Sequence, residues 1–440
     1  MKAKIPSLML GVALSINSLS AQNGQATSGE SYKFTLDQCL EYAFGNSYER
    51  KNMQLTEQSQ DETIEQANSS RRPSVNGSVG ESAQHTGVDN GDIHFSGNAG
   101  VSASVNIYEG GSITNTIKKS KLEKEDATLS TQKYDNSLTI EILNAFLNSL
   151  KNEELLKYKS SIVETSREQA EQGKTKYNAG SILESDWLVL EAQYKSNQTD
   201  TLDAHINRDN SLLDLKKLMS MAPEASLTIV EPDTNAIDAM ALLPSQEEEV
   251  NKALESMPEM KLTQSAIDIA TIQTEITRSA LRPTLSANAG IGTSHRDFDN
   301  FGTQLGDNFY QQIGLNLSIP IYDRGQTKSK LTQNKLALQQ AENDKAQTEL
   351  QIRQTVIEQY KNVKLAYEKY KMTRQMCEAY KAVCDVYNAK FKVGAVVITD
   401  LLQQQDKYIS AINDYIQAKY SFILYRKVLD VYTGDNVSMK

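Results

Sequence analysis

The sequence predicts a mainly α-helical protein built from a duplicated unit, in which each half has a pair of β-strands and a long helical hairpin. The first observation is an internal repeat, because segment 66–75 returns as 276–285. A register of about 210 residues indicates duplication of a large structural unit rather than a solenoid of short repeats. The second observation is that segments 112–172 and 326–393 contain neither glycine nor proline. Helices of that length would be rods of about 100 Å.

Residues 1–21 are predicted to be a signal peptide. Lys2 and Lys4 give a positive start, segment 5–14 is mostly apolar, and segment 18–21 supplies small residues for cleavage. No cysteine follows the predicted cleavage site, so we expect no lipid anchor there.

The first helix is predicted over 32–71, where apolar residues recur at helical spacing. Pro73 should close it, because the residue before a proline is pushed out of the helical conformation. The same Arg-Pro pair returns at Arg282 and Pro283.

Strands follow each Arg-Pro pair. Segment 96–107 alternates apolar and polar residues, which is typical of a strand with one apolar face. The same alternation returns in 284–292 and 309–321, whereas a fourth strand near 75–83 has a weaker pattern. Polar loops at 86–92 and 297–302 would join the strands of each pair.

The long rods are predicted to end at glycines, and another helix follows each of them. Gly180 and Gly394 would be the tips of two antiparallel helical hairpins, with Ser185 and Thr399 as helix caps. Four of the eight prolines fall in the segment that joins the two halves or at its far edge, and one short strand is predicted there at 227–230.

These elements divide the chain into four parts. They are the signal peptide (1–21), a first repeat (22–222), a linker (223–257) and a second repeat (258–440). The first repeat would contain strands at 74–107 and a hairpin at 112–220, and the second would contain strands at 284–321 and a hairpin at 326–433.

The composition narrows the class of protein. Apolar residues are 39% of the 440, which suits long helices with narrow apolar seams. Once the signal peptide is removed, 44 basic residues face 56 acidic ones, a balance that argues against nucleic acid as a partner. Cys377 and Cys384 would lie about 10 Å apart along one helix, too far for a disulfide. With Cys39, they are interpreted as packing residues.

If the protein enters a membrane, its strands and not its helices would cross the bilayer. No segment after the signal peptide has the run of about 20 apolar residues that a membrane helix needs, but strands of about 10 residues can cross a bilayer. Four strands cannot close into a barrel with an interior, and open edges cannot sit in hydrocarbon. Either the strands form a soluble sheet, or several chains contribute to one barrel.

The ordered set of motifs resembles the TolC-type outer membrane efflux proteins. The resemblance rests on the repeated Arg-Pro and strand pairs, on segment 319–325, and on segment 391–394 followed by 399–402. It implies a trimer with a shared transmembrane β-barrel and a helical tunnel. It places the protein in the outer membrane of a Gram-negative bacterium, in contact with outer membrane lipid and with most of the chain in the periplasm.

The resemblance also implies a function and partners. The chain would be the exit channel of a tripartite efflux or type I secretion system. Its partners would be two further copies of itself, a periplasmic adaptor and an inner-membrane pump of the RND, ABC or MFS type, with no cofactor.

Four residues match the family's periplasmic gate. Asp400 matches an aspartate that follows the second tip glycine, and Asp186 is its counterpart in the first half. Gln403 stands where other members have a second acid, and Phe391 matches an aromatic residue near the entrance. The aspartates could equally be first-turn residues favoured by the helix dipole, and Phe391 could be ordinary seam packing.

Two further sets of residues follow from the resemblance. The adaptor would dock on the small residues of the tips, which as plain helix caps would look the same; they are Gly180, Ser181, Val393, Gly394 and Ala395. Junctions between helix and strand would lie at the membrane boundary, at Arg72, Pro73, Arg282, Pro283, Tyr108 and Tyr322.

Catalysis has little support in the sequence. The four histidines are expected in loops or a helix and have no metal-ligand spacing, and there is no phosphate-binding loop or nucleophile elbow. We therefore expect neither an enzyme nor a metal site. The alternatives to a channel are a coiled-coil structural or adhesive surface protein and, more weakly, a secreted enzyme.

Overall fold

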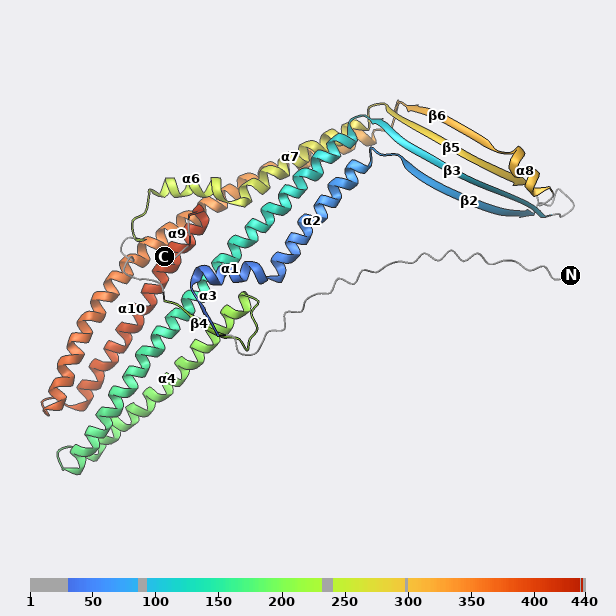
Figure 1. The fold of residues 1–440 in the computed structure, drawn as a ribbon. Coiled ribbons are helices and arrows are strands. Elements are labelled where there is room, and N and C mark those ends of the chain that lie inside the picture. The colour runs from blue at the N-terminus through green and yellow to red at the C-terminus, as the bar shows by residue number, and fades with distance from the viewer. Residues whose placement is uncertain (1–30, 86–92, 232–239, 297–299, 436, 438–440) are drawn as a thin grey trace, which may run out of the picture.

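The computed structural model describes residues 31–85, 93–231, 240–296, 300–435 and 437. The predicted signal peptide, the loop 86–92 and residues 297–299 of the second loop lie outside the described residues. The chain is elongated, with a β-sheet at one end and long helices that run from it to two tips at the other (Figure 1).

The elements follow the same order in both halves. Each half has a short strand, two helices, two long strands and two long helices. In the first half they are β1 (Ser31–Phe34), α1 (Leu36–Asn46), α2 (Tyr48–Ser69), β2 (Ser74–His85), β3 (Ile93–Glu109), α3 (Ser112–Asn178) and α4 (Glu184–Leu218). In the second half they are β4 (Ser226–Ile229), α6 (Gln246–Ser256), α7 (Pro258–Ser279), β5 (Thr284–Arg296), β6 (Tyr310–Ser318), α9 (Gln326–Lys392) and α10 (Ile398–Thr433), with α8 (Phe301–Asp307) between β5 and β6.

The four long strands form one antiparallel sheet in the order β2-β3-β5-β6. Its central pair, β3 and β5, joins the two halves of the chain, with Val101 opposite Ile291. The strand predicted only weakly near 75–83 is present as β2. The short strands β1 and β4 pair in parallel and join the halves a second time.

The helices α3 and α9 each contain 67 residues, which corresponds to about 100 Å and confirms the predicted rods. Towards the sheet they are flanked by α2 and α7, and towards the tips by α4 and α10 (Figure 1). Within the described part of the chain, no helix combines the length and apolar character that spanning a membrane requires.

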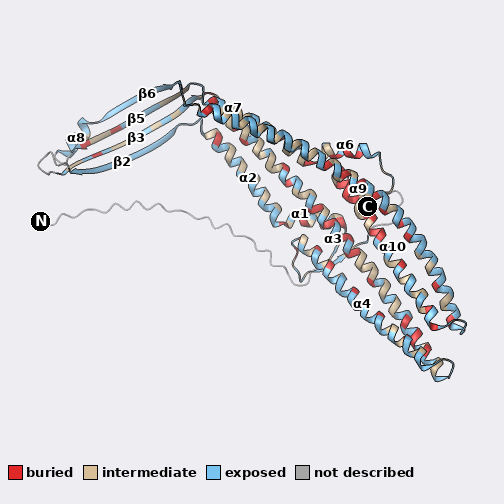
Figure 2. Ribbon diagram, turned by 180° about the vertical axis from the view of Figure 1, so that it is seen from behind, coloured by how far each residue is buried: buried red, intermediate tan, exposed pale blue. Residues whose placement is uncertain are grey.

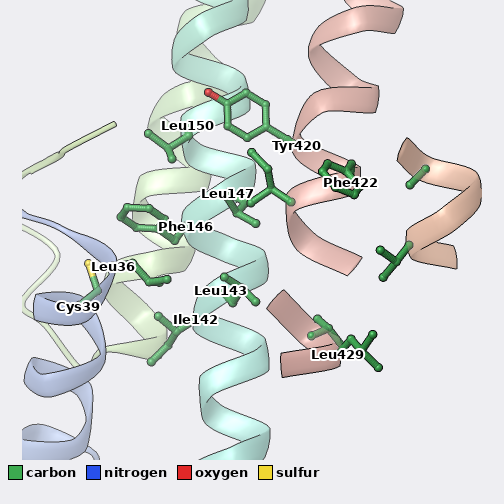
Figure 3. Packing of buried hydrophobic residues seen from close by; sticks show 14 of the residues in the cluster. Leu36, Cys39, Ile142, Leu143, Phe146, Leu147, Leu150, Tyr420, Phe422 and Leu429 are labelled. Atoms are coloured by element: carbon green, nitrogen blue, oxygen red, sulfur yellow. The ribbon is translucent and has the colours of Figure 1, made fainter. Parts of the chain in front are cut away.

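The main apolar core lies midway along the rods, where α1, α3, α9 and α10 meet. Phe146 of α3 and Phe422 of α10 are 1% and 0% exposed. Leu36 and Cys39 of α1 pack in the same core from the side of α3 (Figure 3). Burial raises the pKa of the Cys39 thiol to about 12, which fits a packing role. The sheet is mostly exposed in the single chain, whereas the buried residues concentrate in the helices (Figure 2).

The helix predicted over 32–71 is wrong in two places. Its first residues form β1, and Thr35 then caps α1 by accepting a hydrogen bond from the Gln38 N–H at 3.4 Å. A second break falls at Ser47, whose hydroxyl accepts from the Arg50 N–H at 3.2 Å and starts α2. In both places a hydroxyl side chain supplies the partner that the first free amides of a new helix need.

The second pair of strands differs from the prediction in two ways. β6 ends at Ser318 rather than at 321, because Pro320 has no N–H to continue the ladder. The short helix α8 begins at Phe301, near the end of the predicted polar loop 297–302, and continues to Asp307. It is held on β5 by a hydrogen bond from the Thr293 hydroxyl to the Leu305 carbonyl oxygen at 2.6 Å.

Candidate functional site

The two hairpin tips have the same backbone geometry. Gly180 has a φ of 71° and Gly394 a φ of 77°, the left-handed conformation that glycine adopts most easily after a helix. A Cβ added to either glycine would meet no atom within 4 Å. The five predicted tip residues are all exposed in the single chain: Gly180, Ser181, Val393, Gly394 and Ala395.

Each tip closes its rod with the same hydrogen bond. The Ser181 N–H donates to the Lys176 carbonyl oxygen at 2.8 Å, and the Ala395 N–H donates to the Lys390 carbonyl oxygen at 2.9 Å. These bonds satisfy carbonyls that a helix end leaves without partners. The tips are therefore well-defined caps that project small residues into solvent.

Asp186 and Asp400 occupy the same position, the third residue of the helix that follows each tip. The Asp186 carboxylate accepts a hydrogen bond from the Leu183 N–H at 3.4 Å, and Asp400 is exposed. The prediction that Ser185 and Thr399 cap these helices is wrong. Each helix begins one residue before the hydroxyl residue, at Glu184 and at Ile398, so both hydroxyl residues lie inside the first turn.

The predicted gate residues differ in exposure. Gln403 is exposed on α10, one turn after Asp400. Phe391 is 4% exposed and packs in a small apolar cluster at the tips with Leu190 and Leu401. The side chain of Phe391 therefore lies in the seam between the hairpins, as the packing interpretation expects.

One contact between the hairpins was missed by sequence reasoning. Lys176, at the end of α3, donates a hydrogen bond from Nζ to the Phe391 carbonyl oxygen at 2.9 Å. The same ammonium lies 4.4 Å from the centroid of the Phe391 ring. A lysine in the last turn of a helix is common, so the sequence held no signal that this one reaches the other hairpin.

The two Arg-Pro junctions lie where helix changes to strand. α2 ends four residues before Pro73, and α7 ends four residues before Pro283. Arg282 donates from Nη1 to the Gly110 carbonyl oxygen at 2.7 Å, whereas Arg72 pairs with Glu65 of the preceding helix α2 at 2.6 Å.

The predicted boundary aromatics lie at the same end of the sheet. Tyr108 is near the end of β3 and 48% exposed, and Tyr322 follows β6 and is 84% exposed. Both rings therefore lie largely on the surface of the single chain.

The sheet has an apolar face and a polar face. The strand register places the apolar residues together, and on the edge strands Val79 and Ile313 are 88% and 90% exposed. The apolar face comprises Val75, Val79, Ala99, Val101, Ala103, Ala289, Ile291, Ile313, Leu315 and Leu317. The polar face is uniformly small and uncharged over its centre, with Ser78, Ser82, Asn98, Ser102, Ser104, Asn288 and Asn316.

A polar pair interrupts the apolar face near the loop end of the sheet. His295 Nε2 lies 2.9 Å from Glu81 Oε2 across Gly97. A Cβ on Gly97 would fall 2.3 Å from both side chains, so glycine is required for this pair to form.

Three of the four histidines lie in strands and not in the expected loops, whereas His205 lies in a helix as expected. The three are His85, His94 and His295, and the helix of His205 is α4. Among the residues that the structure describes, no three histidine, cysteine or acidic side chains gather as a metal site would require.

The sequence matches the family described as outer membrane efflux protein over residues 39–220 and 250–434. It is 22% identical to the alkaline protease secretion protein AprF of Pseudomonas aeruginosa, over 68% of this chain and 61% of that protein. It is 22% identical to the outer membrane efflux protein BepC of Brucella suis, over 91% and 84%. It is 23% identical to the outer membrane protein TolC of Escherichia coli, over 70% and 63%. The chain thus spans less than two thirds of the length of AprF and TolC.

Solved structures with similar folds are outer membrane channels. The Campylobacter jejuni CmeC channel aligns with a TM-score of 0.74 at 18% identity, over 99% of this chain and 94% of that one. The OprN channel aligns with a TM-score of 0.76 at 16% identity, over 91% and 90%. At these identities the likeness establishes the fold, and it confirms the predicted fold class.

Proposed function

This chain belongs to the outer membrane efflux protein family, and we propose that it forms a passive exit channel in the outer membrane of a Gram-negative bacterium. Three copies would assemble into one tunnel, with most of each chain in the periplasm. The energy for transport would come from an inner-membrane pump, joined to the tunnel by a periplasmic adaptor. The pump would be of the RND, ABC or MFS type, and the channel itself would do no chemistry and need no cofactor.

The observation that most strongly supports this proposal is the sheet, with its two edge strands and its exposed apolar face. Its edge strands β2 and β6 each pair on one side within the described chain, and its apolar face is exposed. Unpaired strand edges are costly in hydrocarbon, because each free amide or carbonyl loses its partner. Copies that pair β2 with β6 of a neighbour would satisfy both edges, turn the apolar face to lipid and enclose the small polar side chains around water.

The helices support the same assembly. In the half of the rods nearest the tips, α3 packs on α4 and α10, and α10 packs on α9, so α4 and α9 are the outer helices there. Both have exposed apolar residues, among them Leu202 and Ile206 on α4 and Leu365 and Met372 on α9. Apolar surface on two long helices of one chain fits burial against a second copy.

The tips would supply the gate and the adaptor site. Asp186 and Asp400 stand at equivalent places on the two hairpins, and copies around an axis would bring them into rings of negative charge that favour cations. The exposed residues of both tips would receive the adaptor, since small side chains let another backbone approach closely.

Assembly and conduction test the proposal together. We expect the purified full chain in detergent to be a trimer, and to give small single-channel conductance in planar bilayers because the tunnel rests closed. A monomer without conductance in lipid would reject the channel and favour an adhesive or structural coiled-coil protein instead.

A further inference from the structure

A cavity of about 360 Å³ lies between the two helical hairpins, which are α3 with α4 and α9 with α10 (Figure 1). Side chains from all four of these helices line it, and all of them belong to one chain. The cavity is therefore built without a second copy. Its volume falls within the range of about 300–1,000 Å³ that small-molecule sites in proteins usually have.

Two tyrosines form the aromatic side of the cavity. Tyr158 of α3 and Tyr408 of α10 meet edge to face, with their ring centroids 5.9 Å apart. Ile162 and Ile409 add apolar surface to the lining. Burial raises the pKa of the Tyr158 hydroxyl, which therefore stays protonated. This hydroxyl is buried and has no hydrogen-bond partner among the described residues, and an occupant of the cavity with a polar group would supply one.

Uncharged amides form the polar side of the cavity. Gln169 of α3 donates from Nε2 to Asn388 Oδ1 of α9 at 3.0 Å, and Gln405 of α10 donates to the same oxygen at 3.2 Å. Both glutamines keep a carbonyl oxygen that can accept a further hydrogen bond. On α4, Asn197 accepts a hydrogen bond from Gln193 at 3.2 Å, and its own amide nitrogen can donate.

The charged residues of the lining are confined to its exposed side. Lys381 and Asp385 lie one turn apart on α9, have opposite charges and are both exposed. The buried part of the lining is polar but uncharged, and includes Ser166, Asn197 and Cys384. A charged occupant would lose its hydration there without gaining a buried partner of opposite charge. The lining therefore favours an uncharged molecule.

We propose that this cavity is a binding site for a small uncharged aromatic molecule that carries both hydrogen-bond donors and acceptors. The ring of the ligand packs against the two tyrosines. Its donors reach the carbonyl oxygens of Gln169 and Gln405, and its acceptor receives the Asn197 amide. The site goes beyond the proposed function, because a chain that never conducts would still contain it.

The probe for this site is 4-(hydroxymethyl)benzamide, which combines one ring, a hydroxyl and an amide without a charge. Calorimetric titration of the full-length protein in detergent should show one saturable site per chain with a Kd of about 1 mM or tighter. The charged analogue 4-(hydroxymethyl)benzoate should bind at least about tenfold more weakly. If the probe gives no saturable heat beyond that of detergent alone, the cavity holds only water and the proposal fails.

Matched variants test the polar side of the cavity. Gln405→Met keeps the length of the side chain and removes its amide, so it should weaken binding of the probe about fivefold or more. Gln198→Met is the control, because Gln198 is exposed on α4, bonds the Tyr194 hydroxyl at 2.7 Å and does not line the cavity. Equal Kd values in these two variants would overturn the proposal.

A second variant tests the space itself. Ser166→Leu places a larger side chain at a buried position of the lining and should abolish binding of the probe. Unchanged binding in a folded Ser166→Leu protein would contradict the site. If that variant does not fold, Gln405→Met and the measurement below still decide.

The buried thiol of Cys384 reports where the probe binds, because it belongs to the lining. Alkylation of Cys384 by N-ethylmaleimide, followed by mass spectrometry of peptides from the wild-type protein, should slow as the probe is added. The midpoint of this protection should equal the calorimetric Kd. A rate that does not depend on the concentration of the probe would place any binding elsewhere and overturn the proposal.

The channel and the ligand site fail separately. Wild-type protein that binds the probe but gives no conductance in planar bilayers would reject the channel and keep the site. A conducting trimer without saturable binding of the probe would reject the site and keep the channel.

Discussion

Arg282 donates a hydrogen bond from Nη1 to the Gly110 carbonyl oxygen at 2.7 Å, and so joins the start of β5 to the turn between β3 and α3. Gly110 belongs to the first half of the chain and Arg282 to the second. Arg72, at the equivalent junction, binds Glu65 of the preceding helix α2, and both of these side chains are more than half exposed. The two Arg-Pro junctions are therefore unequal, because Arg282 bridges the halves and Arg72 pairs locally.

This difference predicts unequal losses of stability. Arg282→Ala should lower the free energy of unfolding by about 1–2 kcal/mol, because it removes a charge-assisted hydrogen bond at a partly buried carbonyl. Arg72→Ala should cost less than about 0.5 kcal/mol, as exposed ion pairs usually do. Thermal unfolding of the two variants in detergent checks this, and equal shifts would contradict the bridging role of Arg282.

The turn at Gly110 should not tolerate a side chain. Its φ is 63°, and a Cβ there would lie 2.6 Å from the Ser279 carbonyl oxygen. Gly110→Ala should therefore cost more than the roughly 1–2 kcal/mol of the left-handed conformation alone. Gly325→Ala is the control, because Gly325 has a φ of 79° with no atom within 4 Å of an added Cβ. Unfolding midpoints that fall equally would show that the steric contact adds nothing.

Two neighbouring glutamates on α6 should respond to pH in opposite ways. Burial raises the pKa of Glu249, which is 1% exposed and has a carboxylate oxygen without a hydrogen-bond partner among the described residues. Hydrogen bonds from Ser245, from its backbone and then its hydroxyl, lower the pKa of Glu248.

A raised pKa in the folded state means that stability falls as pH rises through and above the ordinary value of 4.5. Glu249→Gln should therefore raise the free energy of unfolding at pH 7, by about 1 kcal/mol, and the gain should vanish near pH 4. The lowered pKa of Glu248 gives stability above 4.5 that is lost on acidification, so Glu248→Gln should destabilise at pH 7. Urea titrations at both pH values check the signs, and a loss at pH 7 in Glu249→Gln would contradict the first.

The equivalent aspartates at the tips should control conduction. Asp400→Asn is expected to raise single-channel conductance or weaken cation preference several-fold, because it removes one ring of charge from the closed end. Asp186→Asn should act in the same direction. Reversal potentials in a salt gradient measure the preference, and wild-type values in both variants would leave the aspartates as first-turn residues.

A bulky side chain at the second tip should block export without preventing assembly of the trimer. Gly394→Trp fills the space that an adaptor would approach, whereas Gly394→Asn keeps a residue that tolerates the left-handed conformation. We expect export of a reporter substrate to fall at least tenfold in the first variant and less in the second, with both trimeric in detergent. Normal export in Gly394→Trp would remove this tip from the docking site.

Much of the fold was readable from local patterns. The alternation in 96–107 predicted β3, and the lack of glycine and proline in 326–393 predicted α9 almost to its last residue. The break at Ser47 and the helix α8 were missed, because each depends on a partner elsewhere: Tyr134 for the Ser47 hydroxyl and Thr293 for α8. The spacing of hydrophobic residues shows which face of a helix or strand is buried, but it does not show which residue will pack against that face.

The sequence by itself determined the duplicated order of elements, the length of the rods, the two-faced strands and the glycine tips, since each follows from spacing within a short window. The tertiary structure alone decided that Arg282 and not Arg72 bridges the halves, that Lys176 crosses to Phe391, and that Glu81 meets His295 over Gly97. Those pairs lie more than 170 residues apart in the chain. Their contacts exist because the sheet and the rods bring the two halves side by side, and no local pattern specifies which side chains then fall within reach.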